Sequence, residues 1–278
     1  MIVRFFLLSC ILFLNASCGT SQGPNYTESA NNFTYNKLTA EAKEKYAEAI
    51  KLKYQSILGN KNFSGQILVA KNGEILFEDY KGFANYKSKD SLVAETPIHL
   101  ASVSKTFTGM AALKLWEKDQ LDLKATVDHY LPGFPYKDVT IELLLSHRSG
   151  LPDYAYFLES RQYKSVRYKT RRGRWAKKLV LVKNDAPFRQ GLYTNKDVLD
   201  FMIQRKPAIA ANPDRVFRYC NTNYVLLALI IEKITGKDFP TYMQETIFKP
   251  LKMEHSFVMS QQNMDKYLPS YNPQMVPF

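Results

Sequence analysis

The stretch Ile98-His99-Leu100-Ala101-Ser102-Val103-Ser104-Lys105-Thr106-Phe107-Thr108 contains the only Ser-x-x-Lys pattern in the 278-residue chain. If a helix begins at Ser102, the side chains of Ser102 and Lys105 lie on one face of it. A lysine amine beside a serine hydroxyl can accept its proton when the amine is desolvated, and the helix N-terminus favours the alkoxide that forms. The pattern therefore predicts a nucleophilic serine, with an exposed Ser and Lys on a helix surface as the alternative.

A second candidate segment, Tyr219-Cys220-Asn221, lies more than a hundred residues further along the chain. The Tyr219 oxygen could assist as a general base, and the Asn221 amide could hold a substrate carbonyl or orient Lys105. A tyrosine beside an apolar helix is more often part of the core, so this segment alone decides nothing.

Three blocks together carry a resemblance: residues 98–108, Leu143-Leu144-Leu145-Ser146-His147-Arg148-Ser149-Gly150-Leu151-Pro152, and Phe217-Arg218-Tyr219-Cys220-Asn221-Thr222-Asn223-Tyr224. In this order they resemble the serine hydrolases of the class C β-lactamase and penicillin-binding-protein family. The resemblance covers about residues 63–257.

The resemblance implies an acyl-enzyme mechanism in which Ser102 attacks an amide, ester or lactam carbonyl. Lys105 and Tyr219 would share the proton transfers, and Asn221 would contact the acyl side chain. The backbone amide of Ser102 would be one donor of the oxyanion hole. The family position of His147 implies a structural histidine.

The expected fold class is α+β, with an antiparallel sheet and a helical subdomain of the β-lactamase/transpeptidase type. Helical periodicity predicts a helix over 38–58, and Asn72-Gly73 predicts a two-strand hairpin around it. A further helix over 106–119 carries four apolar residues at three-residue spacing on one face: Phe107, Met110, Leu113 and Trp116. Thr140 and Thr194 are expected helix caps, and the apolar stretch 224–234 is expected to be a buried helix that Gly236 ends.

The match to the family breaks after Tyr224, because no later segment resembles the family's third motif, a Lys- or His-containing triad that ends in Gly. The last glycine, Gly236, is instead a helix stop. We therefore expect residues 38–278 to form a partial domain that lacks the C-terminal strands of the sheet. Either the sequence is a fragment of a longer hydrolase, or a partner chain completes the sheet by strand addition. In both cases a non-catalytic binding or vestigial protein of the same fold is the alternative to an active hydrolase.

The N-terminus predicts export. Met1 to Arg4 is a short positive start, Phe5 to Leu14 is an almost wholly apolar run, and Cys18 follows two small residues. Residues 1–17 are expected to be a signal peptide, Cys18 the lipid-attachment residue of a cell-envelope lipoprotein, and 18–37 a flexible tether. An ordinary cleaved signal with an incidental Cys18 is the alternative.

Positive charge is concentrated in one segment of the chain. The chain carries a formal net charge of +12, and the segment Arg161–Lys183 contains ten basic residues and no acidic residue. A solvated basic loop is the plain interpretation, and contact with an anionic lipid or polymer is the other. No nucleic acid is expected, because no recognisable nucleic-acid module accompanies the charge. The four histidines are scattered, so no metal and no cofactor is expected, and the partner of the site is a small-molecule or peptide substrate.

Overall fold

The computed structural model describes residues 36–59, 61, 63–155, 161–171, 173–184, 194–260, 263 and 268. The predicted signal peptide, the predicted lipidated Cys18 and all but the last two residues of the predicted tether lie outside them. The chain divides into two compact units: the first holds the described residues up to Phe63 together with Ile67–Asp79, and the second holds Ser64–Gln66 and Tyr80–Phe278. None of the described helices is long and apolar enough to cross a membrane.

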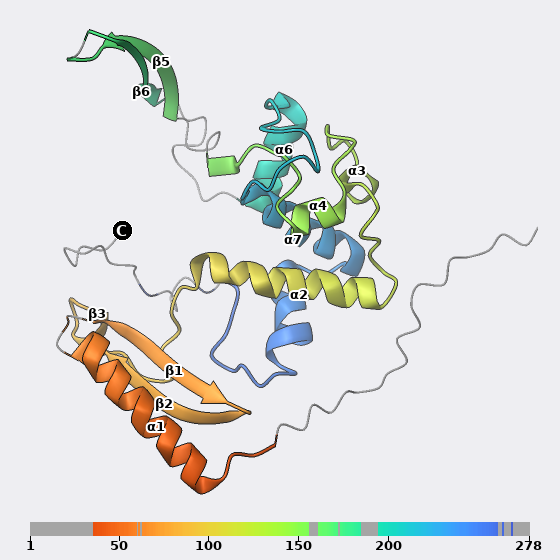
Figure 1. The fold of residues 1–278 in the computed structure, drawn as a ribbon. Helices are drawn as coiled ribbons and strands as arrows, with labels where there is room; N and C mark the ends of the chain where they lie inside the picture. The colour runs from red at the N-terminus through yellow and green to blue at the C-terminus, as the bar shows by residue number, and fades with distance from the viewer. Residues whose placement is uncertain are drawn as a thin grey trace, which may run out of the picture. The chain divides into compact units, whose positions relative to one another are not determined.

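The first unit is built from a helix and a hairpin, as the sequence predicts. Its elements are α1 (Ala40–Tyr54), the π-helical turn η1 (Gln55–Gly59) and most of β1 (Gly65–Lys71) and β2 (Glu74–Lys81) (Figure 1). Asn72 and Gly73 both adopt positive φ, 51° and 76°, as a two-residue hairpin turn requires. The rings of Tyr54 and Phe77 pack 5.0 Å apart, and Lys43 pairs with Glu74 at 3.0 Å, so α1 is tied to β2 by both apolar and charged contacts.

The second unit is centred on α7 (Thr222–Thr235). Its side chains Leu226, Leu227, Ile230 and Ile231 are completely buried. The helix ends at Gly236 in the left-handed conformation, with φ of 67°, which confirms the predicted stop. This buried apolar face of α7 contributes much of the core against which the other helices of the unit pack.

The other described helices of this unit range from single turns to α2, which is as long as α7. They are η2 (Ala101–Val103), α2 (Ser104–Glu117), α3 (Val127–Tyr130), α4 (Ile141–Leu145), α6 (Asn195–Arg205), α8 (Phe239–Met243) and η3 (Gln244–Phe248). Thr194 caps α6 in a capping box with Asp197, as predicted. Thr140 is the N-cap residue of α4, but its hydroxyl makes no capping bond and is buried without a hydrogen-bond partner, so the expected side-chain cap is wrong.

Of the four apolar residues that share the predicted face of α2, Phe107 packs against the core, whereas the other three are exposed. The buried residues of α2 are Thr108, Ala111, Ala112 and Leu115. Met110, Leu113 and Trp116 are instead 53%, 40% and 39% exposed. Residues three apart drift around a helix with 3.6 residues per turn, whereas the small residues at 111 and 112 let α2 approach α7 closely.

Two further pairs of strands complete the described elements: β3 (Phe83–Asn85) with β4 (Asp90–Ser91), and β5 (Arg161–Lys169) with β6 (Trp175–Asn184). Both pairs are antiparallel, and Figure 1 shows β5 and β6 as a paired ribbon. The expected basic loop is therefore wrong, since the basic segment forms a hairpin. Its turn is closed by Gly173 N–H, which donates to the Thr170 carbonyl at 2.9 Å. Helices with small antiparallel sheets make the fold α+β, as expected.

Candidate active site

Ser102 lies at the point where the chain enters α2. It is in the 3₁₀ turn η2, two residues before α2 begins, so the α-helix starts just after Ser102 and two residues earlier than the predicted range 106–119. The Lys105 ammonium donates a hydrogen bond to Ser102 Oγ over 3.3 Å, which confirms that the two side chains share one face. Ala101, immediately before Ser102, has a φ of 45°, a strained conformation for a residue with a Cβ. Such strain is common at functional sites.

Tyr219 reaches the same serine from the segment before α7. Its hydroxyl donates to Ser102 Oγ over 2.6 Å, although 117 residues separate the two in sequence. The Lys105 ammonium also lies 5.0 Å from the centre of the Tyr219 ring. The structure thus brings together three of the four residues that the resemblance implies, around one hydroxyl oxygen.

The charge of Lys105 changes the acidity of Tyr219. A hydrogen bond from Lys105, followed by one from Ser102, holds the pKa of the Tyr219 hydroxyl below the ordinary tyrosine value. A larger share of Tyr219 is therefore deprotonated near neutral pH than for a free tyrosine. The phenolate oxygen can then accept a proton from Ser102, which is the task of a general base.

His147 packs against the ring of Tyr219 and helps to hold it in place. Its Nδ1 accepts a hydrogen bond from the backbone N–H of Cys220 over 3.1 Å, and its ring stacks on the Tyr219 ring with centroids 4.5 Å apart. Burial, followed by the nearby charge of Lys105, lowers the pKa of His147. The neutral imidazole keeps Nδ1 available as an acceptor, in agreement with the structural role that the sequence implies.

Asn221 is held by Asp153, a residue that the sequence analysis did not single out. Asp153 Oδ2 accepts from the Asn221 backbone N–H at 2.6 Å and from its side-chain amide nitrogen at 3.0 Å. The carboxylate thereby stands at the N-terminus of α7, where its charge complements the helix dipole. The only feature of the sequence that could have pointed to Asp153 is its place in the chain, directly after the block that ends at Pro152.

Replacing Asp153 by Ala is expected to lower the free energy of unfolding by about 1–3 kcal/mol, because two donors of Asn221 lose their acceptor. Asp153→Asn keeps an acceptor oxygen and is expected to lose less. Asp214→Ala is the matched control, since it removes an ion pair of Arg148 that is largely exposed and contributes about 1 kcal/mol or less. Urea unfolding measures all three, and equal losses for Asp153→Ala and Asp214→Ala would contradict the assignment.

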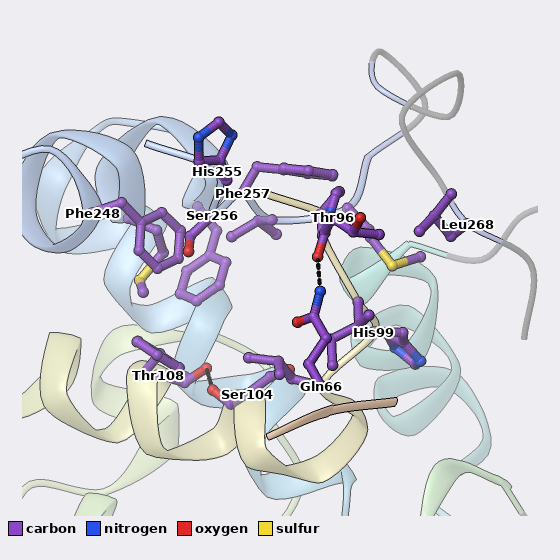
Figure 2. A pocket seen from close by; sticks show the side chains of 18 of the residues that line it. Gln66, Thr96, His99, Ser104, Thr108, Phe248, His255, Ser256, Phe257 and Leu268 are labelled. Atoms are coloured by element: carbon purple, nitrogen blue, oxygen red, sulfur yellow. Dashed lines mark hydrogen bonds between the residues drawn. The ribbon is translucent and has the colours of Figure 1, made fainter. Parts of the chain in front are cut away.

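Two cavities of the second unit bear on the position of the site. The smaller, of about 260 Å³, is lined by Leu151, Asp153, Ala155, Arg218, Tyr219 and Asn221, and so adjoins two of the site residues. The larger, of about 730 Å³, is lined by Ser104 and Thr108 of α2 and by Phe248 and Ser256, among others (Figure 2). Ser102, Lys105 and Tyr219 do not line it. Ser102 and Lys105 do not line the smaller cavity either, so the candidate site is defined by the hydrogen bonds around Ser102 Oγ, and the smaller cavity adjoins it through Tyr219 and Asn221.

No group of three or more His, Cys, Asp or Glu side chains in the described part of the chain could hold a metal ion. Cys220, between Tyr219 and Asn221, is a buried free thiol whose pKa is raised by burial. The Ser102 hydroxyl, with its lysine and tyrosine neighbours, has the surroundings of a nucleophile.

Comparison with known proteins places this constellation in a family. The family described as Beta-lactamase matches residues 57–275, and the chain belongs to that family. Solved structures with the same fold include a protein described as a hydrolase.

Three proteins are similar to this chain in sequence or in fold. Penicillin-binding protein 4* of Bacillus subtilis (strain 168) is 34% identical over 220 residues, which are 77% of this chain and 43% of that protein. EstCE1, described as a hydrolase with promiscuous acyltransferase activity, has a TM-score of 0.60 at 21% identity, over 86% of this chain and 60% of its own. D-amino acid amidase from Ochrobactrum anthropi SV3 has a TM-score of 0.54 at 22% identity, over 74% and 51%. The chain spans less than half the length of the curated relatives that it matches.

Proposed function

We propose that Ser102 is the nucleophile of a serine hydrolase that acts on an amide, ester or β-lactam carbonyl through an acyl-enzyme. The observation that carries this proposal is the position of Ser102 Oγ, 2.6 Å from the Tyr219 hydroxyl and 3.3 Å from the Lys105 ammonium. A serine with an adjacent base, and a cation that lowers the pKa of that base, is an activated nucleophile.

The reaction proceeds in two balanced steps. In the first, the Tyr219 phenolate takes the Ser102 proton and the Ser102 oxygen bonds to the carbonyl carbon. The bond from that carbon to the leaving nitrogen or oxygen then breaks, and Tyr219 gives the proton to the leaving atom. In the second, Tyr219 takes a proton from water while the water oxygen bonds to the acyl carbon; the ester bond to Ser102 Oγ breaks, Ser102 Oγ takes the proton from Tyr219, and the acid leaves. The Lys105 charge stabilises the phenolate throughout, and Asp153 fixes Asn221 beside the acyl group.

The names of the similar proteins support the substrate class. One is named for binding penicillin, one is described as a hydrolase with acyltransferase activity, and one is an amidase. All three activities need an acyl carbonyl beside an activated nucleophile. We infer that the substrate of this chain carries such a carbonyl.

The test is intact-mass analysis of the purified chain after incubation with a fluorescent penicillin and, separately, with an activated ester. An added mass that is absent in Ser102→Ala and present in Ser104→Ala, a matched serine two residues further on, is the expected result. Decay of the added mass with time identifies a hydrolase. An adduct that persists would instead favour a binding protein that cannot turn over, and a folded chain with no adduct would refute the nucleophile.

We also propose that the chain is exported and carries lipid on Cys18, on the basis of the positive start, the apolar run and the position of that cysteine. The same mass measurement, made on protein recovered from expressing cells, tests this. The expected mass lacks residues 1–17 and includes lipid that Cys18→Ser removes. An intact N-terminus, or an equal mass increment in Cys18→Ser, would overturn the proposal.

A further inference from the structure

The end of the β5–β6 hairpin exposes basic and apolar side chains together. We define the hairpin tip as residues 166–171 and 173–176. Its basic residues Arg167, Lys169, Arg171 and Arg174 are all exposed, and none of its residues is acidic. Trp175 is 63% exposed, and Val166 and Tyr168 are also exposed. Large apolar side chains at the end of a hairpin that is itself rich in charge suggest a surface that receives a partner.

The tip holds its tryptophan between cations. The Arg167 guanidinium lies 5.6 Å and the Lys169 ammonium 5.9 Å from the Trp175 ring. The strand register places Lys169 directly opposite Trp175, and Arg167 two residues before Lys169 on the same face. Val166 and Tyr168 alternate with them and therefore occupy the other face. Each face of the tip thus carries at least one apolar side chain.

The hairpin also stands as a sheet of only two strands among the described residues. A two-stranded hairpin without a third strand or a helix against it is marginally stable in water. Contact with a partner surface would offset this deficit. The basic edge residues also discourage pairing with a further strand, so a partner that joins the edge is disfavoured.

An anionic lipid surface matches this combination best. Basic side chains are drawn to anionic headgroups, and Trp and Tyr settle at the boundary between headgroups and acyl chains. Single-stranded nucleic acid would also attract the charges, but a base stacks on an uncovered ring face. In the tip, Arg167 and Lys169 already lie over the Trp175 ring, where a base would have to stack. Val166 has no ring and offers no stacking surface.

We propose that the hairpin tip is a docking surface for an anionic membrane. Arg167, Lys169, Arg171 and Arg174 contact headgroup phosphates, and Trp175, which shares a face with Arg167 and Lys169, enters the interface. This surface is independent of the chemistry at Ser102, so either proposal can fail without the other.

The experiment measures binding of the full chain to lipid vesicles. Cys18→Ser removes the predicted lipidation site, and Trp116→Phe leaves Trp175 as the single tryptophan, because the chain has only two. Vesicles of phosphatidylcholine alone are compared with vesicles that also contain phosphatidylglycerol. The expected result is a blue shift of Trp175 fluorescence, and quenching by brominated lipid, only when phosphatidylglycerol is present, with both effects weakened by salt.

The decisive variant replaces Lys169, Arg171 and Arg174 by Gln. Its partition onto phosphatidylglycerol vesicles is expected to fall about 10²-fold, from about 1 kcal/mol for each charge near the surface. The matched control replaces Lys45, Lys51 and Lys53 of α1 by Gln, which removes the same net charge elsewhere. It is expected to retain binding.

Three results would overturn the proposal. Equal losses in the two triple variants would mean that net charge alone drives binding. Trp175 fluorescence that does not respond to phosphatidylglycerol would exclude insertion of the tip. Binding to a single-stranded oligonucleotide that quenches Trp175 more strongly than vesicles do would assign the surface to nucleic acid instead.

Discussion

Replacing Lys105 by Gln is expected to slow acylation of Ser102 by about 10²- to 10⁴-fold, the usual contribution of a group that governs proton transfer. The change removes the ammonium that donates to Ser102 Oγ and that lowers the pKa of Tyr219. The measurement is the initial rate of adduct formation with an activated ester. Lys118→Gln, at the C-terminal end of the same helix, removes the same charge and is expected to react at the wild-type rate.

The same substitution is expected to shift the pH dependence of acylation to higher pH. The phenolate of Tyr219 is the reactive form, so acylation rises with pH through the pKa of Tyr219. In the wild type this rise lies below the ordinary tyrosine pKa, because Lys105 stabilises the phenolate. In Lys105→Gln the pKa of Tyr219 returns toward its ordinary value, and the rise moves to higher pH. An unshifted profile would show that Tyr219 does not serve as the base.

Replacing Gly150 by Ala is expected to lower the free energy of unfolding by about 3–5 kcal/mol, at the upper end of what one substitution does. Gly150 has a φ of 69°, and an added Cβ would lie 1.9 Å from the carbonyl oxygen of Ala211. The backbone there cannot retreat freely, since the N–H groups of Ala210 and Ala211 both donate to the Gly150 carbonyl. Urea unfolding followed by circular dichroism measures the loss.

Gly236→Ala separates conformational strain from the clash. Gly236 has nearly the same φ, 67°, but an added Cβ there meets nothing within 4 Å. Only the left-handed conformation is penalised, and the expected loss is about 1–2 kcal/mol. If the two alanine variants unfolded at the same urea concentration, the contact with Ala211 would not be the cause.

The parts of the fold that depend on the backbone preferences of one or two residues could be predicted from the sequence. Asn72-Gly73 requires a tight turn, and Gly236 ends an apolar helix, so both features follow from backbone preferences of single residues. The β5–β6 hairpin was missed because its charge was taken as a sign of solvation, although Val166 and Tyr168 alternate with basic residues as in a strand. The buried face of α2 depends on which helix packs against it, and no local rule gives that.

The candidate site was predictable in part for the same reason. Ser102 and Lys105 are neighbours on one turn, so their spacing in the sequence is enough to bring them together. The meeting of Ser102 with Tyr219 was suggested only by the resemblance of whole blocks. Asp153 acts through a contact across 68 residues with Asn221, and nothing in its local sequence marks that partner.

The sequence separation of 117 between Ser102 and Tyr219 also bears on how the protein folds. Closing so long a loop has an entropic cost that local contacts cannot offset. Packing of α2 against α7 in the shared core offsets this cost. Contacts of high sequence separation form late and slow the overall folding rate. Reactivity at Ser102 should therefore emerge together with the assembled helical core, and its recovery after dilution from denaturant can time that assembly.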